Sequence, residues 1–185
     1  MGEATELRRH TLVLGGARSG KTRRALALAD TGATRVYVAT AEAFDDEMRA
    51  RIAAHTAERA GRGWTTIEAP LDLPGALSAR ALAQAGVALH RMAVPVVVVD
   101  CLTLWLSNLM LGGHDIDAAT GHITAALGAT PARVILVSNE VGFGIVPDNA
   151  LARRFRDAQG RLNQTLAAAV GTVELVVAGL VVKLK

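Results

Sequence analysis

Aromatic residues are scarce in this chain, and their scarcity limits both the core and the partners to be expected. Phe, Trp and Tyr make up 3% of the 185 residues, although 51% of the residues are hydrophobic. The core must therefore be built mainly from Ala, Val and Leu. Nucleic-acid binding usually combines a basic surface with aromatic side chains on which bases stack. With few aromatics and a formal net charge of +3, the sequence predicts no nucleic-acid partner.

Cysteine and long apolar runs are also missing. The one cysteine, Cys101, has no second thiol in the chain to pair with, which excludes an internal disulfide and is typical of a reducing compartment. No apolar stretch approaches the roughly 20 residues that a membrane-spanning helix needs. The residues before Gly15 include no apolar region long enough for a signal peptide. We therefore expect no membrane span and a cytoplasmic location.

Short runs of β-branched residues alternate with longer segments rich in Ala and Leu. Near-continuous hydrophobicity within such runs is typical of parallel strands covered by helices on both faces. The pattern predicts strands over 11–14, 35–40, 94–100, 133–138 and 173–177, and an edge strand in the final LVVKLK. It predicts helices over 21–30, 45–59, 73–91 and 151–170, and a further helix after Asp100. The sequence therefore predicts an α/β fold with a mainly parallel sheet, in one domain spanning residues 1–185.

The stretch LVLGGARSGKTRRALAL joins the first expected strand to the first expected helix. It contains the pattern G-x-x-x-x-G-K-[ST], in which glycines bring backbone N–H groups to phosphate oxygens and a helix N-terminus faces the same anion. Lys21 is expected to contact the β- and γ-phosphates, and the Thr22 hydroxyl to ligate Mg²⁺. The alternative is a glycine-rich turn with an incidental lysine, but the flanking strand and helix favour a P-loop NTPase-like fold. The expected loop comprises Gly15, Gly16, Ala17, Arg18, Ser19, Gly20, Lys21 and Thr22.

Polar residues also end two other expected strands. Asp100 follows four valines, where a carboxylate of Walker B type would hold the metal; the alternative is that Asp100 caps the next helix. Asn139 and Glu140 follow the strand over 133–138. Because the carboxyl ends of parallel strands meet at one edge, both are candidates for contact with nucleotide, substrate or metal.

The expected helix over 45–59 carries Glu47, Arg51, His55 and Arg59 at intervals of four residues, which places them along one face. One interpretation is a solvated face with ion pairs between successive turns. The other is a functional face, because flanking arginines favour the neutral, nucleophilic imidazole and bind an incoming phosphate. The spacing alone leaves both interpretations open.

Longer motifs make the chain resemble the bifunctional adenosylcobinamide kinase / adenosylcobinamide-phosphate guanylyltransferase family of cobalamin biosynthesis. The resemblance rests on GGARSGKT, YVATAEAFDDEMRARIAAH, VVDCLTLWLSNLM, VSNEVGFGIVPDNALARRFRDAQGRLNQTLAAA and the ending VVAGLVVKLK. These motifs run in order from the first strand to the last residue and leave about ten N-terminal residues, 73–93 and 112–132 unmatched. The phosphate loop is generic, whereas the motif that begins with SNEVG is highly specific.

The resemblance implies two reactions. ATP or GTP would phosphorylate the hydroxyl of the aminopropanol arm of adenosylcobinamide, and GMP from GTP would then be transferred to that phosphate. The second reaction gives adenosylcobinamide-GDP and pyrophosphate through a guanylylated histidine. The resemblance also implies Mg²⁺ as cofactor and a homotrimer as the assembly.

The family pattern assigns the guanylylated histidine to the helix after DDEM, and His55 is the one histidine within that expected helix. Relatives often carry Ser where Thr22 stands, and both supply a hydroxyl. Beyond the phosphate loop, the resemblance implies nucleotide contacts at Ala39, Thr40, Ala41, Thr56, Ala57, Glu58, Arg59, Glu68 and Asp100.

Three alternatives to this function stay open on the sequence alone. A P-loop GTPase switch would be expected to show a guanine-reading N-K-x-D motif, and Asn139 is followed by Glu140 instead of Lys. Another small-molecule kinase would share the phosphate loop but lack a covalent histidine. A nucleotide-dependent binding module would transfer nothing.

Overall fold

A seven-stranded sheet forms the centre of the computed structural model, which describes residues 7, 9–30, 34–42, 46–89 and 94–185. The order across the sheet is β3-β2-β4-β5-β1-β6-β7. Six strands run parallel, and β7 pairs antiparallel with β6. The strands are β1 (Thr11–Gly15), β2 (Arg35–Ala39), β3 (Trp64–Glu68), β4 (Val96–Asp100), β5 (Arg133–Asn139), β6 (Thr172–Val177) and β7 (Leu180–Lys183).

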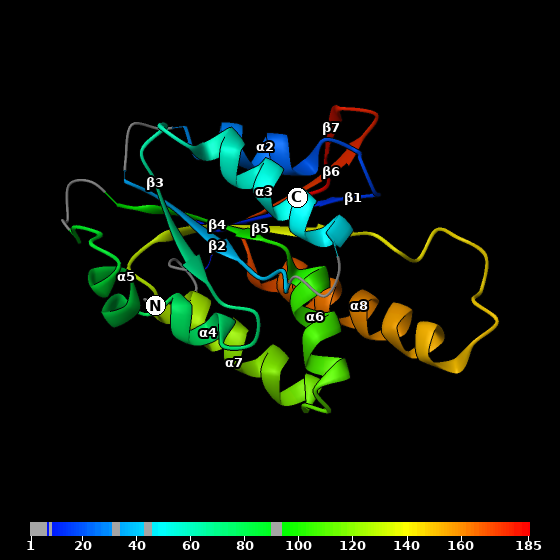
Figure 1. The fold of residues 1–185 in the computed structure, drawn as a ribbon. Coiled ribbons are helices and arrows are strands. Elements are labelled where there is room, and N and C mark those ends of the chain that lie inside the picture. Colours follow the sequence, from blue (N-terminus) through cyan, green and yellow to red (C-terminus); the bar gives the residue numbers. More distant parts are fainter. Residues whose placement is uncertain (1–6, 8, 31–33, 43–45, 90–93) are drawn as a thin grey trace.

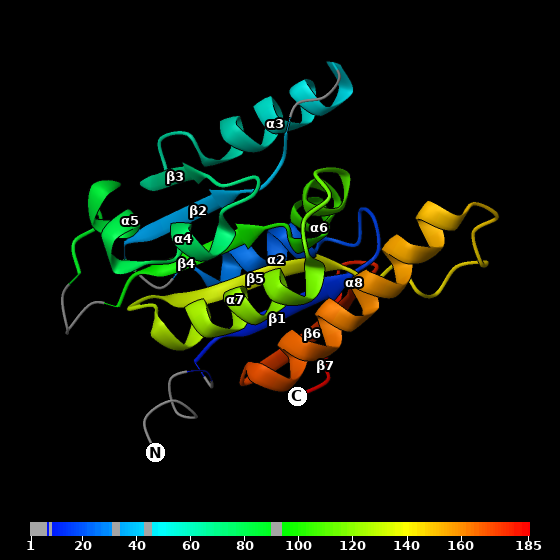
Figure 2. The ribbon, with the colours of Figure 1, turned by 90° about the horizontal axis from the view of Figure 1, so that it is seen from below.

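Helices cover both faces of the sheet, as expected. Figures 1 and 2 show α2 and α3 on one face and α4, α6, α7 and α8 on the other. The helices are α2 (Lys21–Leu28), α3 (Asp46–Arg59), α4 (Leu73–Ala76), α5 (Ala79–Gln84), α6 (Leu102–Leu111), α7 (Ile116–Ala129) and α8 (Ala150–Ala169). The α/β prediction is therefore confirmed, while the single nucleotide-binding domain over 1–185 stays a prediction.

The two faces of the strands build two separate hydrophobic clusters. Alternate residues of β4 show the division, since Val97 and Val99 pack under α4, α6 and α7 whereas Val96 and Val98 pack towards α2. All four valines are at least 98% buried. This two-sided burial explains why the central strands read as continuous apolar runs in the sequence.

A partly buried ion pair, in which the Arg24 side chain is 34% exposed, fixes α2 against the sheet. Arg24 of α2 donates from Nε and from a terminal guanidinium nitrogen to the two carboxylate oxygens of Glu174 on β6, both at 2.8 Å. Glu174 is 7% exposed, so the pair is held in fixed geometry within the packed structure. Because the phosphate loop leads directly into α2, this pair also sets the direction in which the N-terminus of α2 points.

The expected helix over 73–91 is wrong as one element. Asp72 accepts a hydrogen bond from the Gly75 amide at 2.9 Å and Ser78 accepts one from the Ala81 amide at 3.1 Å, so two N-caps start two short helices, α4 and α5. Residues 90 and 91, at the end of this expected helix, lie outside the described part of the chain. So does residue 45, the first residue of the expected helix over 45–59.

Two elements were not expected from the sequence. The strand β3 lies at the edge of the sheet and is partly exposed, so it has no long apolar run. The helix α7 buries only Ile123 and Leu127 fully, and its many Ala, Gly and Thr residues weaken the hydrophobic period. The other elements agree with expectation within one or two residues at each end.

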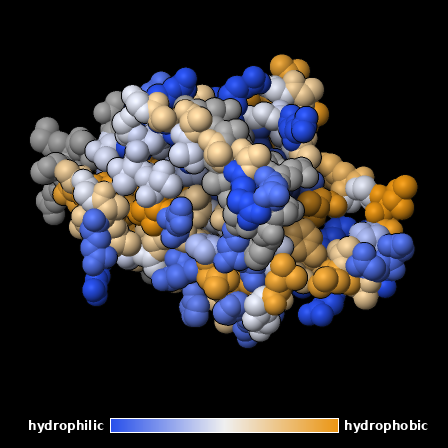
Figure 3. All heavy atoms as spheres, viewed as in Figure 1, coloured by the Kyte–Doolittle hydropathy of each residue, from blue (hydrophilic) through white to orange (hydrophobic). Residues whose placement is uncertain are grey.

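Large exposed apolar side chains gather on the loop between β5 and α8. Phe143 is 83% exposed and Ile145 is 97% exposed. Figure 3 shows hydrophobic residues at the right-hand end of the molecule, where this loop lies in Figure 1. No described helix is both long and apolar enough to cross a membrane.

We predict that Glu174→Gln lowers the free energy of unfolding at neutral pH because it breaks the bond with Arg24. Hydrogen bonding to Arg24 lowers the pKa of Glu174 below its ordinary value of 4.5. A carboxyl whose pKa is lowered by folding stabilises the protein above its unfolded-state pKa, and this contribution is lost as the pH falls through the folded-state pKa. The difference between wild type and Glu174→Gln in urea titrations should therefore shrink as the pH falls below about 4.5.

The matched control is Asp157→Asn, which neutralises a carboxylate whose side chain is 56% exposed and lies 3.5 Å from Arg156. Such surface pairs contribute about 0–1 kcal/mol. A Glu174→Gln effect that stayed constant from pH 7 to pH 3, or that matched Asp157→Asn, would contradict the assigned role of the partly buried pair.

Candidate functional site

The turn from β1 to α2 has the geometry of a phosphate loop. A Cβ atom on Gly15 would lie 2.4 Å from Ser19 Oγ and 2.7 Å from the Val176 carbonyl oxygen, so only glycine fits there. Gly20 has a φ of 97°, in the left-handed region that favours glycine, and the helix starts at the next residue. The loop is therefore packed tightly at its start and turned sharply at its end, as a glycine-rich phosphate loop requires.

Lys21 starts α2 and reaches back over the loop. Its ammonium donates a hydrogen bond to the Gly16 carbonyl at 3.0 Å, and the residue is 8% exposed. An ammonium held over a glycine-rich loop is suited to bind a phosphate chain, because the loop fixes the charge while the N–H groups supply further donors.

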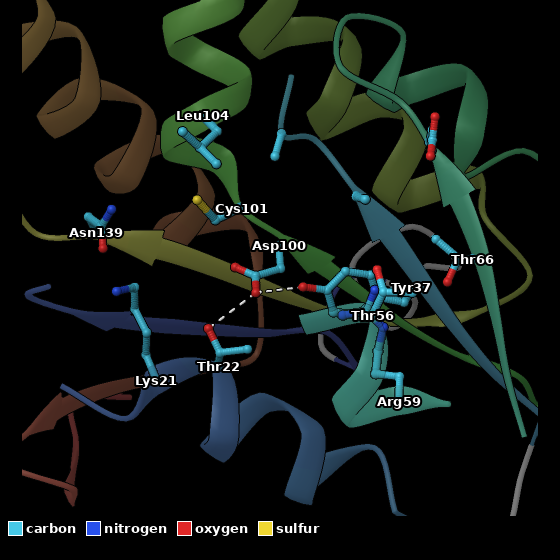
Figure 4. Close-up of a pocket in the computed structure, with 13 residues that line it drawn as sticks. Lys21, Thr22, Tyr37, Thr56, Arg59, Thr66, Asp100, Cys101, Leu104 and Asn139 are labelled. Carbon is cyan, nitrogen blue, oxygen red and sulfur yellow. Dashed lines mark hydrogen bonds between the residues drawn. The ribbon is translucent and has the colours of Figure 1, made fainter. Parts of the chain in front are cut away.

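The Asp100 carboxylate joins three elements at one atom. Its Oδ2 accepts a hydrogen bond from the Tyr37 hydroxyl at 2.7 Å and from the Thr22 hydroxyl at 3.2 Å, shown as dashed lines in Figure 4. Asp100 does not cap α6, because the N-cap residue of that helix is Cys101 and no side chain accepts a capping hydrogen bond there. Asp100 therefore belongs to the cleft between β2, β4 and α2.

Tyr37 also connects this carboxylate to α3. The Arg59 guanidinium carbon lies 3.4 Å from the centroid of the Tyr37 ring, and the Trp64 ring meets Tyr37 edge-on at 6.3 Å. Arg59 is 6% exposed. Burial and the neighbouring Asp100 carboxylate raise the pKa of Tyr37 well above its usual range, so its hydroxyl remains a donor. The C-terminal end of α3 thus rests on a side chain that holds Asp100.

A cleft at the carboxyl edge of the sheet brings many of the expected residues together. Of the residues that the sequence suggested, this cleft is lined by Lys21, Thr22, Ala39, Ala41, Thr56, Arg59, Glu68, Asp100 and Asn139. In Figure 4, Asn139 and Lys21 lie on one side of Asp100, and Thr56 and Arg59 lie on the other. Arg18 is exposed on the loop.

Other expected residues do not line the cleft. Thr40 is fully buried, and its hydroxyl donates to the Cys101 carbonyl and accepts from the Cys101 amide, both at 2.7 Å. It therefore ties β2 to the end of β4. Glu140 accepts a hydrogen bond from the Gly142 amide at 2.8 Å, within its own loop. Ala57 is exposed on α3.

His55 lies in α3, whose helical backbone agrees with the expectation. The side chains of His55, Arg51, Glu47 and Glu58 are outside the described part of the structure, so their shared face stays a prediction.

Four residues that line the cleft were missed from the sequence, namely Tyr37, Thr66, Cys101 and Leu104. Tyr37 carried a usable signal, because the only tyrosine of the chain stands in the middle of a strand expected to be wholly apolar. A buried phenol needs a hydrogen-bond partner, and the parallel strand β4 supplies it. Thr66 lies on the unexpected strand β3, and Leu104 lies on the first turn of α6.

Cys101 also lines the cleft but has the properties of a packing residue. It is 6% exposed, and burial together with the nearby Asp100 raises the pKa of its thiol to about 11. The thiolate, which is the reactive form of cysteine, is therefore scarce at neutral pH.

The donor set beside the phosphate loop fits Mg²⁺. A hydroxyl and a carboxylate lie side by side at Thr22 and Asp100, and Mg²⁺ prefers oxygen ligands completed by phosphates and water. Among the residues that the structure describes, no group of three or more His, Cys, Asp or Glu side chains could hold a metal. Thr22 and Asp100 would therefore supply two oxygen ligands to a cation at this point.

The sequence matches a known family and known proteins over most of its length. Residues 11–184 match the family model described as "Cobinamide kinase / cobinamide phosphate guanyltransferase". The chain is 46% identical over 177 residues to the bifunctional adenosylcobalamin biosynthesis protein CobP of Pseudomonas aeruginosa, covering 94% of this chain and 96% of that protein. It is 41% identical to CobU of Salmonella typhimurium, a protein with the same description, covering 94% of this chain and 98% of that protein.

A solved structure from Pyrococcus horikoshii OT3 shares the fold. Its TM-score is 0.52 at 11% identity, covering 100% of this chain and 92% of that chain. At this identity the likeness concerns the fold alone.

We predict that Tyr37→Phe and Tyr37→Leu separate the two contacts of Tyr37. Both variants remove the hydrogen bond to Asp100, a kind of bond worth about 1.5–3 kcal/mol when the acceptor is charged. Both should therefore raise the Mg²⁺ concentration needed for tight binding of a fluorescent GTP analogue. Only Tyr37→Leu also removes the ring beneath Arg59, a contact worth about 0.5–2 kcal/mol.

Amide hydrogen exchange in α3 measures the second contact. It should be faster in Tyr37→Leu and near wild type in Tyr37→Phe. Equal Mg²⁺ titrations in wild type and Tyr37→Phe would show that the phenol does not hold Asp100.

Proposed function

The chain belongs to the cobinamide kinase / cobinamide phosphate guanyltransferase family, and from this premise we propose that it performs both reactions in the one cleft described above. The first would transfer the γ-phosphoryl group of ATP or GTP to the hydroxyl of adenosylcobinamide. The second would transfer GMP from GTP to adenosylcobinamide phosphate, giving adenosylcobinamide-GDP and pyrophosphate. The observation that carries the proposal is a cleft with a phosphate loop on one side of Asp100 and the end of α3 on the other.

The phosphate-loop side suits the kinase reaction. Lys21 and the loop N–H groups would hold the β- and γ-phosphates and stabilise the charge that develops as the γ-phosphoryl group moves. Thr22 and Asp100 would hold Mg²⁺, which would supply further neutralisation of the phosphate charges. The Thr22 hydroxyl donates its proton to Asp100, so its lone pairs remain available to a cation.

The α3 side suits the guanylyl transfer. We propose His55 as the nucleophile, because the resemblance assigns the guanylylated histidine to this helix. A neutral imidazole nitrogen would bond to the α-phosphorus of GTP while the bond from that phosphorus to the β-phosphate bridge breaks, releasing pyrophosphate. An oxygen of adenosylcobinamide phosphate would then attack the same phosphorus and free the histidine.

Arg59 supports this assignment of the α3 side. It lies one helical turn after His55 and lines the cleft, and its buried Nε has no hydrogen-bond partner among the described residues. A buried guanidinium nitrogen without a partner is suited to receive a phosphate oxygen. Nucleotide contacts at Thr56, Ala57, Glu58 and Glu68, and the homotrimer that the resemblance implies, are part of the same proposal.

We predict that Lys21→Ala impairs both reactions, because one grip on the β- and γ-phosphates serves each. Loss of a charged donor of this kind typically costs on the order of 100-fold or more in rate. The measurement is formation of adenosylcobinamide phosphate and of the GDP form by chromatography. Lys183→Ala is the control, since it removes a lysine from the exposed strand β7. Near-normal product formation by Lys21→Ala in both assays would refute the phosphate-loop assignment.

We predict that His55→Asn abolishes guanylylation and leaves at least part of the kinase reaction. With α-³²P-GTP, Mg²⁺ and no corrinoid, the wild-type protein should become labelled and release pyrophosphate. The label should resist alkali and be lost in mild acid, as expected for a phosphoramidate. The same experiment separates the alternatives, because free labelled GDP would indicate a GTPase switch, and neither label nor GDP would indicate a binding module.

The control for this variant is His122→Asn, which changes an exposed histidine of α7. His122→Asn should keep the label. Labelling that persists in His55→Asn would overturn the assignment of His55 while leaving the phosphate-loop proposal intact.

A further inference from the structure

Asn139 ends the strand that lies between the strand leading into the phosphate loop and the strand ending in Asp100. It is the last residue of β5, and β5 lies between β1, which leads into the phosphate loop, and β4, which ends in Asp100. In the parallel register Asn139 pairs with Gly15. Its side chain therefore starts level with the first residue of the loop and lines the cleft together with Lys21 and Asp100.

The backbone of Asn139 is held from two helices. Its amide donates to the Thr103 hydroxyl of α6 at 2.8 Å, and its carbonyl accepts from the Asn163 side chain of α8 at 3.1 Å. Asn163 in turn accepts from the Ser138 hydroxyl at 2.7 Å and from the Gln159 amide at 3.0 Å. This buried network fixes the end of β5, and a rigid support is what a side chain that positions substrate needs.

The side chain of Asn139 takes no part in this network. Its Oδ1 is buried and has no hydrogen-bond partner among the described residues. A buried polar atom left without a partner costs about 1–3 kcal/mol, so such an atom in a cleft points to a ligand that completes it. Figure 4 shows Asn139 beside Lys21, on the side of Asp100 away from Arg59.

We propose that Asn139 positions the acceptor hydroxyl against the γ-phosphate in the phosphoryl-transfer reaction. This inference rests on the proposed function. A carboxamide offers one acceptor oxygen and two N–H donors, so Oδ1 accepts from the hydroxyl of the substrate while Nδ2 donates to a γ-phosphate oxygen. Holding both reactants with one rigid group favours the in-line approach that phosphoryl transfer requires.

The carboxamide does not take up the proton. The oxygen of the acceptor hydroxyl bonds to the γ-phosphorus while the bond from that phosphorus to the β-phosphate bridge breaks. The nucleoside diphosphate leaves with the electron pair, and the hydroxyl proton passes to an oxygen of the transferred phosphoryl group. Asn139 is therefore a catalytic residue through orientation, and its effect falls on the reaction at the γ-phosphorus.

The guanylyl reaction should not depend on Asn139. That reaction takes place at the α-phosphorus and on a residue of α3, whose end lines the opposite side of the cleft through Thr56 and Arg59. The two activities thus respond differently to Asn139, whereas loss of a general nucleotide contact would impair both.

The test compares Asn139→Ala and Asn139→Leu, which both remove the carboxamide, with wild type and with Gln164→Ala, which removes an exposed carboxamide from α8. We expect both Asn139 variants to lower kcat for phosphorylation of adenosylcobinamide by about 100-fold, the cost typical of a misplaced reactant. Binding of a fluorescent GTP analogue should weaken by about 10-fold, the cost of one lost hydrogen bond to a charged group. Labelling of the protein by saturating α-³²P-GTP should stay within about 3-fold of wild type, because it takes place at the α-phosphorus and does not use the acceptor hydroxyl. Gln164→Ala should match wild type in every assay.

Two results would overturn the inference. One is an unchanged phosphorylation rate in Asn139→Ala, and the other is a parallel loss of phosphorylation and labelling. If Asn139→Ala failed to fold, Asn139→Leu, which keeps a side chain of similar size, would decide by the same two assays. A wild-type protein that formed no phosphorylated product would instead refute the proposed function, so the two failures are distinguishable.

Discussion

The hydrogen bonds at Asp100 Oδ2 are the interaction on which the arrangement of the cleft depends. One carboxylate oxygen accepts from Thr22 on α2 and from Tyr37 on β2, while Asp100 itself ends β4. Both donors are hydroxyls, and the second oxygen of Asp100 is not used by either bond. Tyr37 extends the connection to Arg59 at the end of α3. The phosphate loop, the acidic strand end and the helix that carries His55 are thereby linked through one atom and one ring.

The sheet order makes this convergence possible. Because β4 pairs with both β2 and β5, and β5 pairs with β1, the ends of four strands bring Ala39, Asp100, Asn139 and Gly15 to the same edge. Parallel strands present their carboxyl ends together, and ligands of open α/β sheets bind there. The ion pair between Arg24 and Glu174 then holds α2 against β6. Asp100 and Asn139 are therefore supported by central strands whose preceding residues are buried on both faces of the sheet.

The parts of this site that are encoded locally could be predicted, and the parts made by pairing across the sheet could not. The loop from Gly15 to Thr22 is one continuous stretch, and the position of Asp100 directly after four valines identifies it as an acidic residue at a strand end. In contrast, the partner of Tyr37 depends on β2 pairing with β4, and the unfilled carboxamide of Asn139 depends on β5 lying between β1 and β4. The edge strand β3 escaped detection because half-exposed strands lack the apolar run by which the others were found.

The two proposed reactions attack different phosphorus atoms of a nucleoside triphosphate, and the cleft has polar groups suited to both. Lys21 and Asn139 lie on one side of Asp100, and Arg59 lies on the other. A triphosphate held by the loop through its β- and γ-phosphates would direct its α-phosphate away from the loop. One mode of triphosphate binding then serves both reactions, provided that each reaction brings its own nucleophile to its own end of the triphosphate. An acceptor hydroxyl held at Asn139 and an imidazole on α3, as proposed here, would meet this condition, because they would approach the triphosphate from opposite sides and would not compete for the same space.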